Sequence, residues 1–374
     1  MIRRNIEAKI NSRLGKGKAV IIYGPRQSGK TTLVNEILKN KPSGDILSLN
    51  GDEMDVREIL SSYSSAKLKA IIGNKKIIFI DEAQRIKDIG LIIKIITDNF
   101  KDIQVIATGS STFELMNNIK EPLTGRKYEF NLFPLSFSEL ADNHGLLEET
   151  RMTDHRLIFG SYPEIVINSG DAEENLKMLA DSYLYKDLLA LENISKPYLL
   201  EKIVKSLALQ IGNEVSFSEL AQNTGTSPAT AEKYVNLLEK AYVVFQLTAF
   251  SRNVRNEIKK SRKIYFYDNG IRNAVIGNFS TPESRTDIGA LWENYLVSER
   301  AKRNSNLGIS CSCFFWRTTQ QQEIDYIEET EGKLNAYEFK YGKKKARPPL
   351  TFSNAYPEST FTAVSKDNYY EFLT

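Results

Sequence analysis

Residues 24–31 read Gly-Pro-Arg-Gln-Ser-Gly-Lys-Thr and match the phosphate-binding pattern G-x-x-x-x-G-K-[ST] at every position. The residues before them, 19–23, form an apolar run typical of a buried strand. The residues after them, 32–39, have the apolar spacing of an amphipathic helix. This order predicts a loop that binds phosphate oxygens through its backbone N–H groups. The alternative, an ordinary glycine turn before a helix, is disfavoured by these flanks.

Each part of this loop has an expected role toward a nucleoside triphosphate. Gly24 and Gly29 allow the backbone to turn tightly. Lys30 is expected to contact the β- and γ-phosphates, and the hydroxyl of Thr31 to bind Mg2+. The expected nucleotide-binding residues are Gly24, Pro25, Arg26, Gln27, Ser28, Gly29, Lys30, Thr31 and Thr32. ATP and Mg2+ are therefore the predicted cofactors.

A second, mostly apolar run, residues 76–80, ends in Asp81 and Glu82. It predicts a buried parallel strand that presents two carboxylates at its C-terminal edge. Asp81 is expected to bind the Mg2+ shell, usually through water. Glu82 is placed to polarise the water that attacks the γ-phosphate, as a general base. An acidic strand end without chemistry is the alternative, and a complete P-loop at this distance disfavours it.

A third strand is expected over residues 103–107, and polar residues follow it directly. Thr108 or Ser110 is a candidate for orienting the attacking water, from a strand between the P-loop strand and the Asp81 strand. A simple strand-to-helix turn that caps residues 112–115 is an equally acceptable role for either residue.

Length and charge narrow the class of protein. A chain of 374 residues is long enough for about two to three domains, each with its own core. The formal net charge of +3 is close to neutral, which argues against nucleic-acid binding by the whole chain. No apolar stretch approaches the roughly 20 residues of a membrane-spanning helix, so no membrane partner is expected.

The two cysteines, Cys311 and Cys313, alternate along an expected strand. Two cysteines are too few for a disulfide framework, so a reducing cytoplasm is the expected location. A zinc site is also disfavoured, because the two histidines, His144 and His155, lack ligand spacing.

The pattern of elements divides the chain into four segments. Residues 1–145 alternate strands and helices, which predicts an α/β domain with helices layered on a parallel sheet. Residues 146–210 are mainly helical and are interpreted as a lid or linker. Residues 211–280 have the outline of a winged helix, and residues 281–374 form the last expected domain.

The third segment contains a helix-turn-helix followed by two expected strands. After a short helix, a glycine-bearing turn at 223–227 leads into a second helix over 228–240. Residues 242–247 and 263–267 are expected to pair as the strands of the wing. The intervening stretch, 252–263, is basic at six positions and acidic at one.

The second of these helices offers two interpretations. Its exposed face carries Thr230, Lys233 and Asn236, which can contact phosphates or base edges. The same face carries Glu232 and Glu239, which repel phosphates. Winged helices also serve as protein-contact modules, so DNA contact and protein contact both remain open.

The last segment holds a dispersed set of charged residues. Glu293 lies on an expected helix, Asp325 on an alternating strand, and Glu338 and Lys340 on one face of the next strand. A hairpin that holds Asp325 and Glu338 side by side makes a hard-oxygen site for Mg2+ or Mn2+. Lys340 would then stabilise developing phosphate charge during metal-assisted phosphodiester hydrolysis. A surface hairpin of alternating charge gives the same pattern.

Together these motifs resemble one family, the prokaryotic AAA+-type P-loop ATPases with a C-terminal winged helix and a restriction-endonuclease-like domain of the PD-(D/E)xK type. The most specific matches are residues 24–32 and Ile80-Asp-Glu-Ala-Gln84. Further matches are residues 107–111, 123–126, 133–137, 263–268, 315–317 and 323–325. The chain departs from the family at Ser161, where relatives often repeat glycine, and at Gln322, where a glycine is common.

The resemblance implies the additional-strand sheet topology of AAA+ proteins, with Glu82 as the catalytic glutamate and Lys30 at the phosphates. It also implies that Arg126 senses or stabilises the γ-phosphate, including that of a neighbouring subunit. An ordinary surface arginine is the alternative for Arg126. The candidate nuclease site comprises Glu293, Asp325, Glu338 and Lys340.

Two functions from different classes are therefore expected. The first is an ATP-binding and ATP-hydrolysing AAA+-type molecular switch that acts on DNA through the winged helix and the endonuclease-like domain. The alternative is a regulatory or scaffold ATPase whose C-terminal modules bind protein partners and do not cut nucleic acid. DNA and further copies of the chain are the candidate partners.

Overall fold

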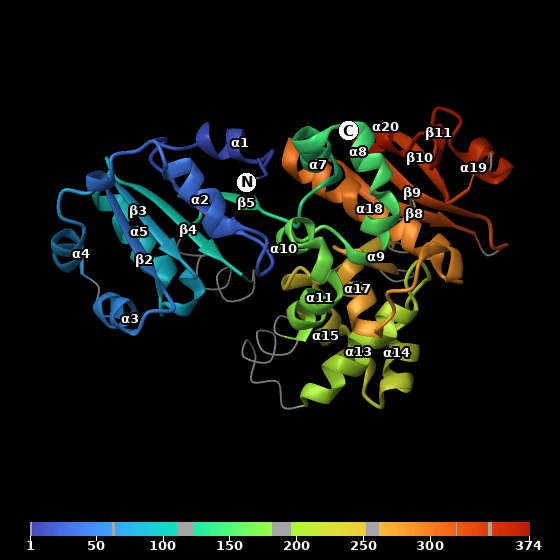
Figure 1. Cartoon of the computed structure of the whole chain (residues 1–374), viewed down its shortest axis with the longest axis horizontal. Helices are drawn as coiled ribbons and strands as arrows, with labels where there is room; N and C mark the ends of the chain where they lie inside the picture. Colours follow the sequence, from blue (N-terminus) through green and yellow to red (C-terminus); the bar gives the residue numbers. More distant parts are fainter. Residues whose placement is uncertain are drawn as a thin grey trace. The chain divides into compact units, whose positions relative to one another are not determined.

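The computed structural model describes residues 2–61, 64–110, 123–181, 196–251, 262–318, 320–342 and 346–374. The chain divides into two compact units, whose colours in Figure 1 run from blue to teal and from green to red. The N-terminal unit comprises Met1–Pro134 with Lys240–Tyr242, and the C-terminal unit comprises Leu135–Glu239 with Val243–Thr374. The first unit ends before residue 145 because Phe137 is already buried in the core of the second.

A five-stranded parallel sheet forms the centre of the N-terminal unit. Its strands are β1 (Ala19–Tyr23), β2 (Ile46–Asn50), β3 (Ile77–Asp81), β4 (Gln104–Gly109) and β5 (Lys127–Asn131). They pair in the order β2-β3-β4-β1-β5, and every pair is parallel. β4 therefore lies between β1 and β3, which confirms the additional-strand order. The carboxyl ends of parallel strands share one edge, so the loop after β1 lies at the same edge as Asp81 and Thr108.

Apolar packing holds this sheet to its helices. β1 is buried along its whole length, as expected for a central parallel strand. Val20 and Ile22 form one core cluster with Leu33 and Ile37 of α2 (Lys30–Leu38). Burial of each such side chain stabilises the fold by roughly 1.5–3 kcal/mol. The other helices of the unit are α1 (Glu7–Asn11), α3 (Met54–Ser61), α4 (Ser65–Ile72) and α5 (Ile89–Asn99).

The C-terminal unit consists of many helices and one mixed sheet. Its helices are α7 (Phe137–His144), α8 (Leu146–Arg151), α9 (Thr153–Phe159), α10 (Pro163–Ile167), α11 (Ala172–Ala180), α13 (Pro197–Leu209), α14 (Phe217–Thr224), α15 (Pro228–Lys240), α17 (Asn269–Ile276), α18 (Ile288–Leu307), α19 (Leu350–Ala355) and α20 (Tyr369–Leu373). Among the described helices of the whole chain, none combines the length and apolarity needed to cross a lipid bilayer.

The mixed sheet joins two segments that the sequence separates. Its strands are β6 (Val244–Ala249), β7 (Arg262–Phe266), β8 (Ser312–Arg317), β9 (Glu323–Thr330), β10 (Lys333–Lys340) and β11 (Thr360–Ser365). They pair in the order β11-β10-β9-β8-β6-β7. The antiparallel pairing of β6 with β7 is as expected, but β6 also pairs with β8. One sheet therefore runs through residues 211–280 and 281–374, and their division into two domains stays a proposal.

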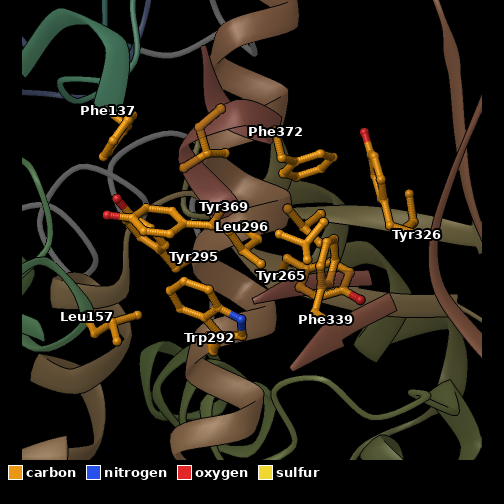
Figure 2. Packing of buried hydrophobic residues seen from close by; sticks show 14 of the residues in the cluster. Phe137, Leu157, Tyr265, Trp292, Tyr295, Leu296, Tyr326, Phe339, Tyr369 and Phe372 are labelled. Carbon is orange, nitrogen blue, oxygen red and sulfur yellow. The ribbon is translucent and has the colours of Figure 1, made fainter. Parts of the chain in front are cut away.

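An aromatic core surrounds helix α18. Figure 2 shows the side chains gathered along this helix, among them Trp292, Tyr295 and Tyr369. The rings of Trp292 and Tyr369 meet edge to face with centroids 5.2 Å apart, a preferred arrangement for aromatic pairs. Trp292 is fully buried, and Glu293 directly follows it on α18. The packing of α18 thus fixes the position of Glu293.

Candidate functional site

The glycine-rich loop lies between β1 and α2, as the sequence predicts. Gly29 adopts a left-handed conformation, with a φ of 92°, and caps the start of α2. A Cβ atom on Gly24 would lie 2.1 Å from the carbonyl oxygen of Leu132, so a side chain does not fit there. The buried Lys30 folds over the loop, and its Nζ donates to the carbonyl oxygens of Gly24 and Pro25 at 3.0 and 2.8 Å.

Two further features of the loop bear on ligand binding. The hydroxyl of Ser28 is fully buried, and no hydrogen-bond partner is present for its Oγ atom among the described residues. Buried polar groups are normally hydrogen-bonded, so this hydroxyl is suited to a polar ligand. Arg4 supports the loop from the N-terminal segment, where its guanidinium donates to the carbonyl oxygens of Ser28 and Phe133 at 2.8 and 2.5 Å. No motif marks Arg4, so the sequence did not predict this role.

Thr31 and Asp81 meet at the edge of the sheet. The hydroxyl of Thr31 donates to Oδ2 of Asp81 at 2.7 Å, and the hydroxyl of Thr108 donates to Oδ1 of the same carboxylate. Hydroxyl and carboxylate oxygens are the ligands that Mg2+ takes in nucleotide sites. The residues present therefore fit a magnesium nucleotide. Thr108 contacts Asp81 directly, and its expected role toward the attacking water stays a prediction.

Glu82 follows Asp81 in a left-handed backbone conformation, with a φ of 46°. Its Oε2 accepts a hydrogen bond from Nε2 of Gln84 at 2.5 Å, and the same Nε2 donates to the hydroxyl of Ser110 at 2.9 Å. Gln84 is buried, so this link between the ends of β3 and β4 is largely shielded from water. Gln84 belongs to the Ile80–Gln84 motif but was not singled out. The structure places it as the partner that holds the Glu82 carboxylate.

Arg126 does not reach the loop of its own chain. It immediately precedes β5, and its carbonyl oxygen accepts from the N–H of Ala19, the first residue of β1. The loop begins at the other end of β1, roughly 15 Å away at about 3.3 Å per residue. The Arg126 guanidinium instead pairs with Asp98 at 2.7 Å, and this hydrogen bond lowers the pKa of the Asp98 carboxyl. Within this chain Arg126 therefore lies away from the loop, and its role at a nucleotide stays a prediction.

The four charged residues predicted in the last segment gather in one region of the C-terminal unit. Nζ of Lys340 lies 2.6 Å from Oε1 of Glu338. Oδ2 of Asp325 accepts the backbone N–H of Phe339 at 2.7 Å. Burial, followed by the charges of Glu293 and Glu338, raises the pKa of Asp325 well above its usual range. These three carboxylates therefore act on one another.

Lys263 and Glu323 also belong to this group, although neither was predicted as a site residue. Nζ of Lys263 lies 2.9 Å from Oε1 of Glu293 and 2.5 Å from Oε1 of Glu323. The hydroxyl of Tyr265 donates to the same Glu293 oxygen at 2.7 Å. Burial alone would lower the pKa of Lys263. The negative charges of Glu293 and Glu323 outweigh this effect, so the pKa of Lys263 is raised. We call Glu293, Glu323, Asp325, Glu338, Lys263 and Lys340 the carboxylate cluster.

The strand pattern around Lys263 indicates that its side chain is buried, but it does not indicate which groups Lys263 contacts. Lys263 shares a strand face with Tyr265, a core aromatic residue, because the two are separated by one position. It was interpreted instead as part of a basic surface hairpin. Of that basic stretch, residues 252–261 lie outside the described part of the chain. Arg262 stacks on the ring of Phe217, with its guanidinium carbon 4.2 Å from the centroid.

The described side chains of the carboxylate cluster do not form a cage of three mutually close ligands. In the described ranges, just one set of three Cys, His, Asp or Glu residues has ligand atoms within 4.8 Å of one another, and it consists of Cys311, Cys313 and Glu328. The oxygens of Glu293, Asp325 and Glu338 are thus not gathered around one ion-sized space. A metal site built on Asp325 and Glu338 with water or phosphate oxygens, as the nuclease-like resemblance implies, stays a prediction.

The cysteine set has ligand spacing, but its carboxylate is already paired. Arg300 pairs with both carboxylate oxygens of Glu328, at 2.9 and 2.7 Å, and its positive charge opposes a metal cation. Without a bound metal ion, burial raises the pKa of the Cys313 thiol to about 12. Metal ligation requires the thiolate. A metal ion at this set would therefore have to displace the Cys313 proton, and neither histidine belongs to the set.

The polar face of α15 is partly engaged within its own unit. Glu239 accepts the backbone N–H of Gln246 on β6 at 3.0 Å, and the Gln246 side chain bonds to both Glu239 and Asn236. Lys233 and Glu232 are exposed, and Thr230 is half-buried. Helix α15 therefore presents a mixed surface, with Asn236 turned toward β6.

Comparison with known proteins assigns part of the chain. Residues 16–141 match the family model described as an AAA domain. Residues 150–282 and 288–366 match two domains of unknown function, DUF8612 and DUF4143. An uncharacterized protein of Mycobacterium tuberculosis is 26% identical over 345 residues, covering 90% of this chain and 74% of that protein. An uncharacterized protein of Haemophilus influenzae is 24% identical over 326 residues, covering 82% and 78%.

Solved structures give weaker likenesses. The Pif1 helicase from Candida albicans has a TM-score of 0.28 at 14% identity, covering 48% of each chain. PCH-2 of C. elegans has a TM-score of 0.26 at 15% identity, covering 40% of this chain and 46% of that chain. These scores support no conclusion by themselves. The sheet order, the loop and the match of residues 16–141 make the N-terminal unit an AAA-type domain with the fold of a P-loop NTPase.

Proposed function

We propose that this protein binds ATP with Mg2+ and hydrolyses it, and that it works as a molecular switch. The contact that carries the proposal joins Thr31 of the loop to Asp81 at the end of β3, at 2.7 Å. These side chains come from separate elements and together offer the oxygen ligands that Mg2+ prefers. The unpartnered hydroxyl of Ser28 in the same loop supports a polar ligand there.

Each residue has a defined task in this proposal. Lys30 exchanges its bonds to the carbonyl oxygens of Gly24 and Pro25 for bonds to the phosphates. Thr31 and Asp81 hold Mg2+, which neutralises phosphate charge when it is bound. Glu82 accepts the proton of the attacking water. Arg26, Gln27 and the rest of the loop line the phosphates through the backbone.

The proposal includes an oligomer. Arg126 lies at the far end of β1 from the loop of its own chain, so it acts here on the nucleotide of a neighbouring copy. Its present partner, Asp98, is partly exposed, and the pair is therefore open to exchange with another anion.

The proposed target of the switch is DNA, contacted through a winged helix in residues 211–280 and an endonuclease-like domain in residues 281–374. The exposed Lys233 on α15 supports phosphate contact. A specific observation favours the alternative, a scaffold that binds protein: Asn236 and Glu239 are tied to Gln246, which leaves less of the helix for base contacts.

Turnover of ATP by the full-length chain, with and without duplex DNA, tests both parts of the proposal. Phosphate release is measured with Mg2+ at several protein concentrations, alongside DNA binding between about 50 and 200 mM salt. The proposal predicts turnover, and DNA affinity that falls steeply with salt as counterions are released.

The outcomes separate the two functions. Turnover without any DNA binding supports the scaffold ATPase. Turnover that DNA stimulates supports the DNA switch. If ATP neither binds nor is hydrolysed, the assignment of the N-terminal unit as an ATPase is overturned.

A further inference from the structure

We propose that the ε-ammonium of Lys263 is the resident cation of the carboxylate cluster and takes the place that a divalent metal ion would otherwise have there, so that the parent protein takes up no such ion at this cluster. The inference concerns the C-terminal unit and does not depend on nucleotide binding.

The first argument is the burial of Lys263 among carboxylates. Its side chain is 2% exposed, and its Nζ contacts Glu293 of α18 and Glu323 of β9 at 2.9 and 2.5 Å. A buried charge is stable only when it is paired and hydrogen-bonded. The two glutamates provide that pairing, and the ring of Phe315 provides further contact, 5.5 Å from Nζ to its centroid.

The second argument is that the other carboxylates are already engaged. Glu338 is paired with Lys340 at 2.6 Å, and Asp325 accepts the backbone N–H of Phe339 at 2.7 Å. Glu293 receives both Lys263 and the hydroxyl of Tyr265 on one oxygen. The cluster therefore offsets part of its negative charge by internal contacts.

The third argument concerns the space that a metal ion would need. Within the described part of the chain, Glu293, Asp325 and Glu338 do not form a set whose ligand atoms lie within 4.8 Å of one another. A divalent ion would have to draw these oxygens together next to a buried ammonium. Repulsion between like charges at such short range opposes this strongly.

The arrangement has a structural consequence. Lys263 lies on β7, while its two glutamate partners lie on α18 and β9. The cluster thus joins a helix to two strands that are not neighbours in the sheet. We infer that the cluster serves to cross-link these elements. The nuclease-like sequence pattern alone would instead suggest metal-dependent cleavage of nucleic acid.

Binding of Mn2+ to the nucleotide-free, full-length protein tests the inference by electron paramagnetic resonance. The parent and Asp325→Asn are expected to bind the same number of Mn2+ ions, because the parent has no metal at this cluster. Lys263→Met is expected to gain a Mn2+ site at this cluster. Its affinity for Mn2+ there should exceed that of the parent by at least about tenfold. The double variant Lys263→Met/Asp325→Asn should lose this site.

Lys302→Met is the matched control. Lys302 is another buried lysine of the same unit, paired with Glu299 at 2.6 Å, and its replacement should create no site that depends on Asp325. A Mn2+ ion in the parent that Asp325→Asn removes would overturn the inference. So would a folded Lys263→Met variant that gains no site. If Lys263→Met does not fold, the comparison of the parent with Asp325→Asn still decides.

Discussion

The hydroxyl of Thr31 donates a hydrogen bond to the carboxylate of Asp81 at 2.7 Å, although 50 residues separate the two in the sequence. The contact exists because β4 is inserted between β1 and β3, which brings the ends of three parallel strands to one edge. The same edge carries Lys30 and Glu82. The predictions for the N-terminal unit follow from this arrangement.

Replacement of Lys30 by alanine should remove tight ATP binding. A charge-assisted hydrogen bond contributes about 1.5–3 kcal/mol, so the affinity should fall at least about tenfold. Isothermal titration calorimetry measures this directly. Lys39→Ala is the control, because Lys39 lies at the other end of α2 and is exposed. Unchanged ATP affinity in Lys30→Ala would remove Lys30 from the site.

Replacement of Glu82 by glutamine should separate binding from hydrolysis. The amide keeps the shape of the side chain but cannot accept the proton of water, so turnover should fall by about 10²–10⁴-fold. ATP affinity should stay close to that of the parent. Glu58→Gln, an exposed position on α3, serves as control. Normal turnover in Glu82→Gln would show that another residue is the base.

Arg126→Ala should leave the ATP affinity of the single chain unchanged, since Arg126 lies at the opposite edge of the sheet from the loop. If copies of the chain associate, the parent's turnover per chain rises with protein concentration. The turnover of Arg126→Ala should be lower than the parent's only in that concentration range. Asp98→Ala, which removes the present partner of Arg126, controls for loss of the ion pair. Weaker ATP binding by the dilute Arg126→Ala protein would contradict the observed placement.

Arg4→Ala should weaken the loop from outside the motif. It removes the hydrogen bonds that Arg4 donates to the carbonyl oxygens of Ser28 and Phe133, at an expected cost of about 1–3 kcal/mol in the free energy of unfolding. Chemical denaturation measures the loss, and ATP affinity should fall with it. Arg3→Ala changes an exposed neighbour and should have little effect on either quantity. Equal stability of the two variants would argue against an anchoring role.

The thiol of Cys313 should react slowly near neutral pH. Burial raises its pKa to about 12, so the thiolate fraction, and with it the alkylation rate, should rise about tenfold per pH unit until the pH approaches that value. Because the pKa of Cys313 is higher in the folded than in the unfolded protein, the buried neutral thiol contributes to the free energy of unfolding. This contribution is complete below about pH 9 and is lost as the pH rises toward 12. Mass spectrometry of Cys311→Ser after iodoacetamide treatment measures the rate. Alkylation at pH 7.5 as fast as that of free cysteine would contradict the burial of Cys313.

The sequence was informative where function depends on contiguous residues. The glycine-rich loop and the Asp81-Glu82 pair could be predicted because each motif carries its own strand or helix beside it. Their meeting at one edge also follows, since parallel strands share that edge. Arg4, Gln84 and Lys263 could not be predicted in the same way. Their partners depend on which distant elements pack together, and no local pattern records that.

The fate of β6 shows the same limit at the level of topology. Its pairing with β7 is local and was predicted, whereas its pairing with β8 joins Thr248 to Phe314 and Ala249 to Phe315. The residues of β6 do not indicate whether it pairs only with β7 in a two-stranded wing or also with a further strand. The outcome depends on β8, which lies far along the chain.

The pairing of β6 with β8 also affects how the protein can be dissected. Expression of residues 211–280 and 281–374 as separate fragments would expose the hydrogen-bonding edges of both strands. Unpaired edges of this kind associate with other chains. Such fragments should aggregate, and failed binding assays with them would say nothing about the intact protein. A cut after Pro134 crosses no strand pair of either sheet and is the safer place to divide the polypeptide.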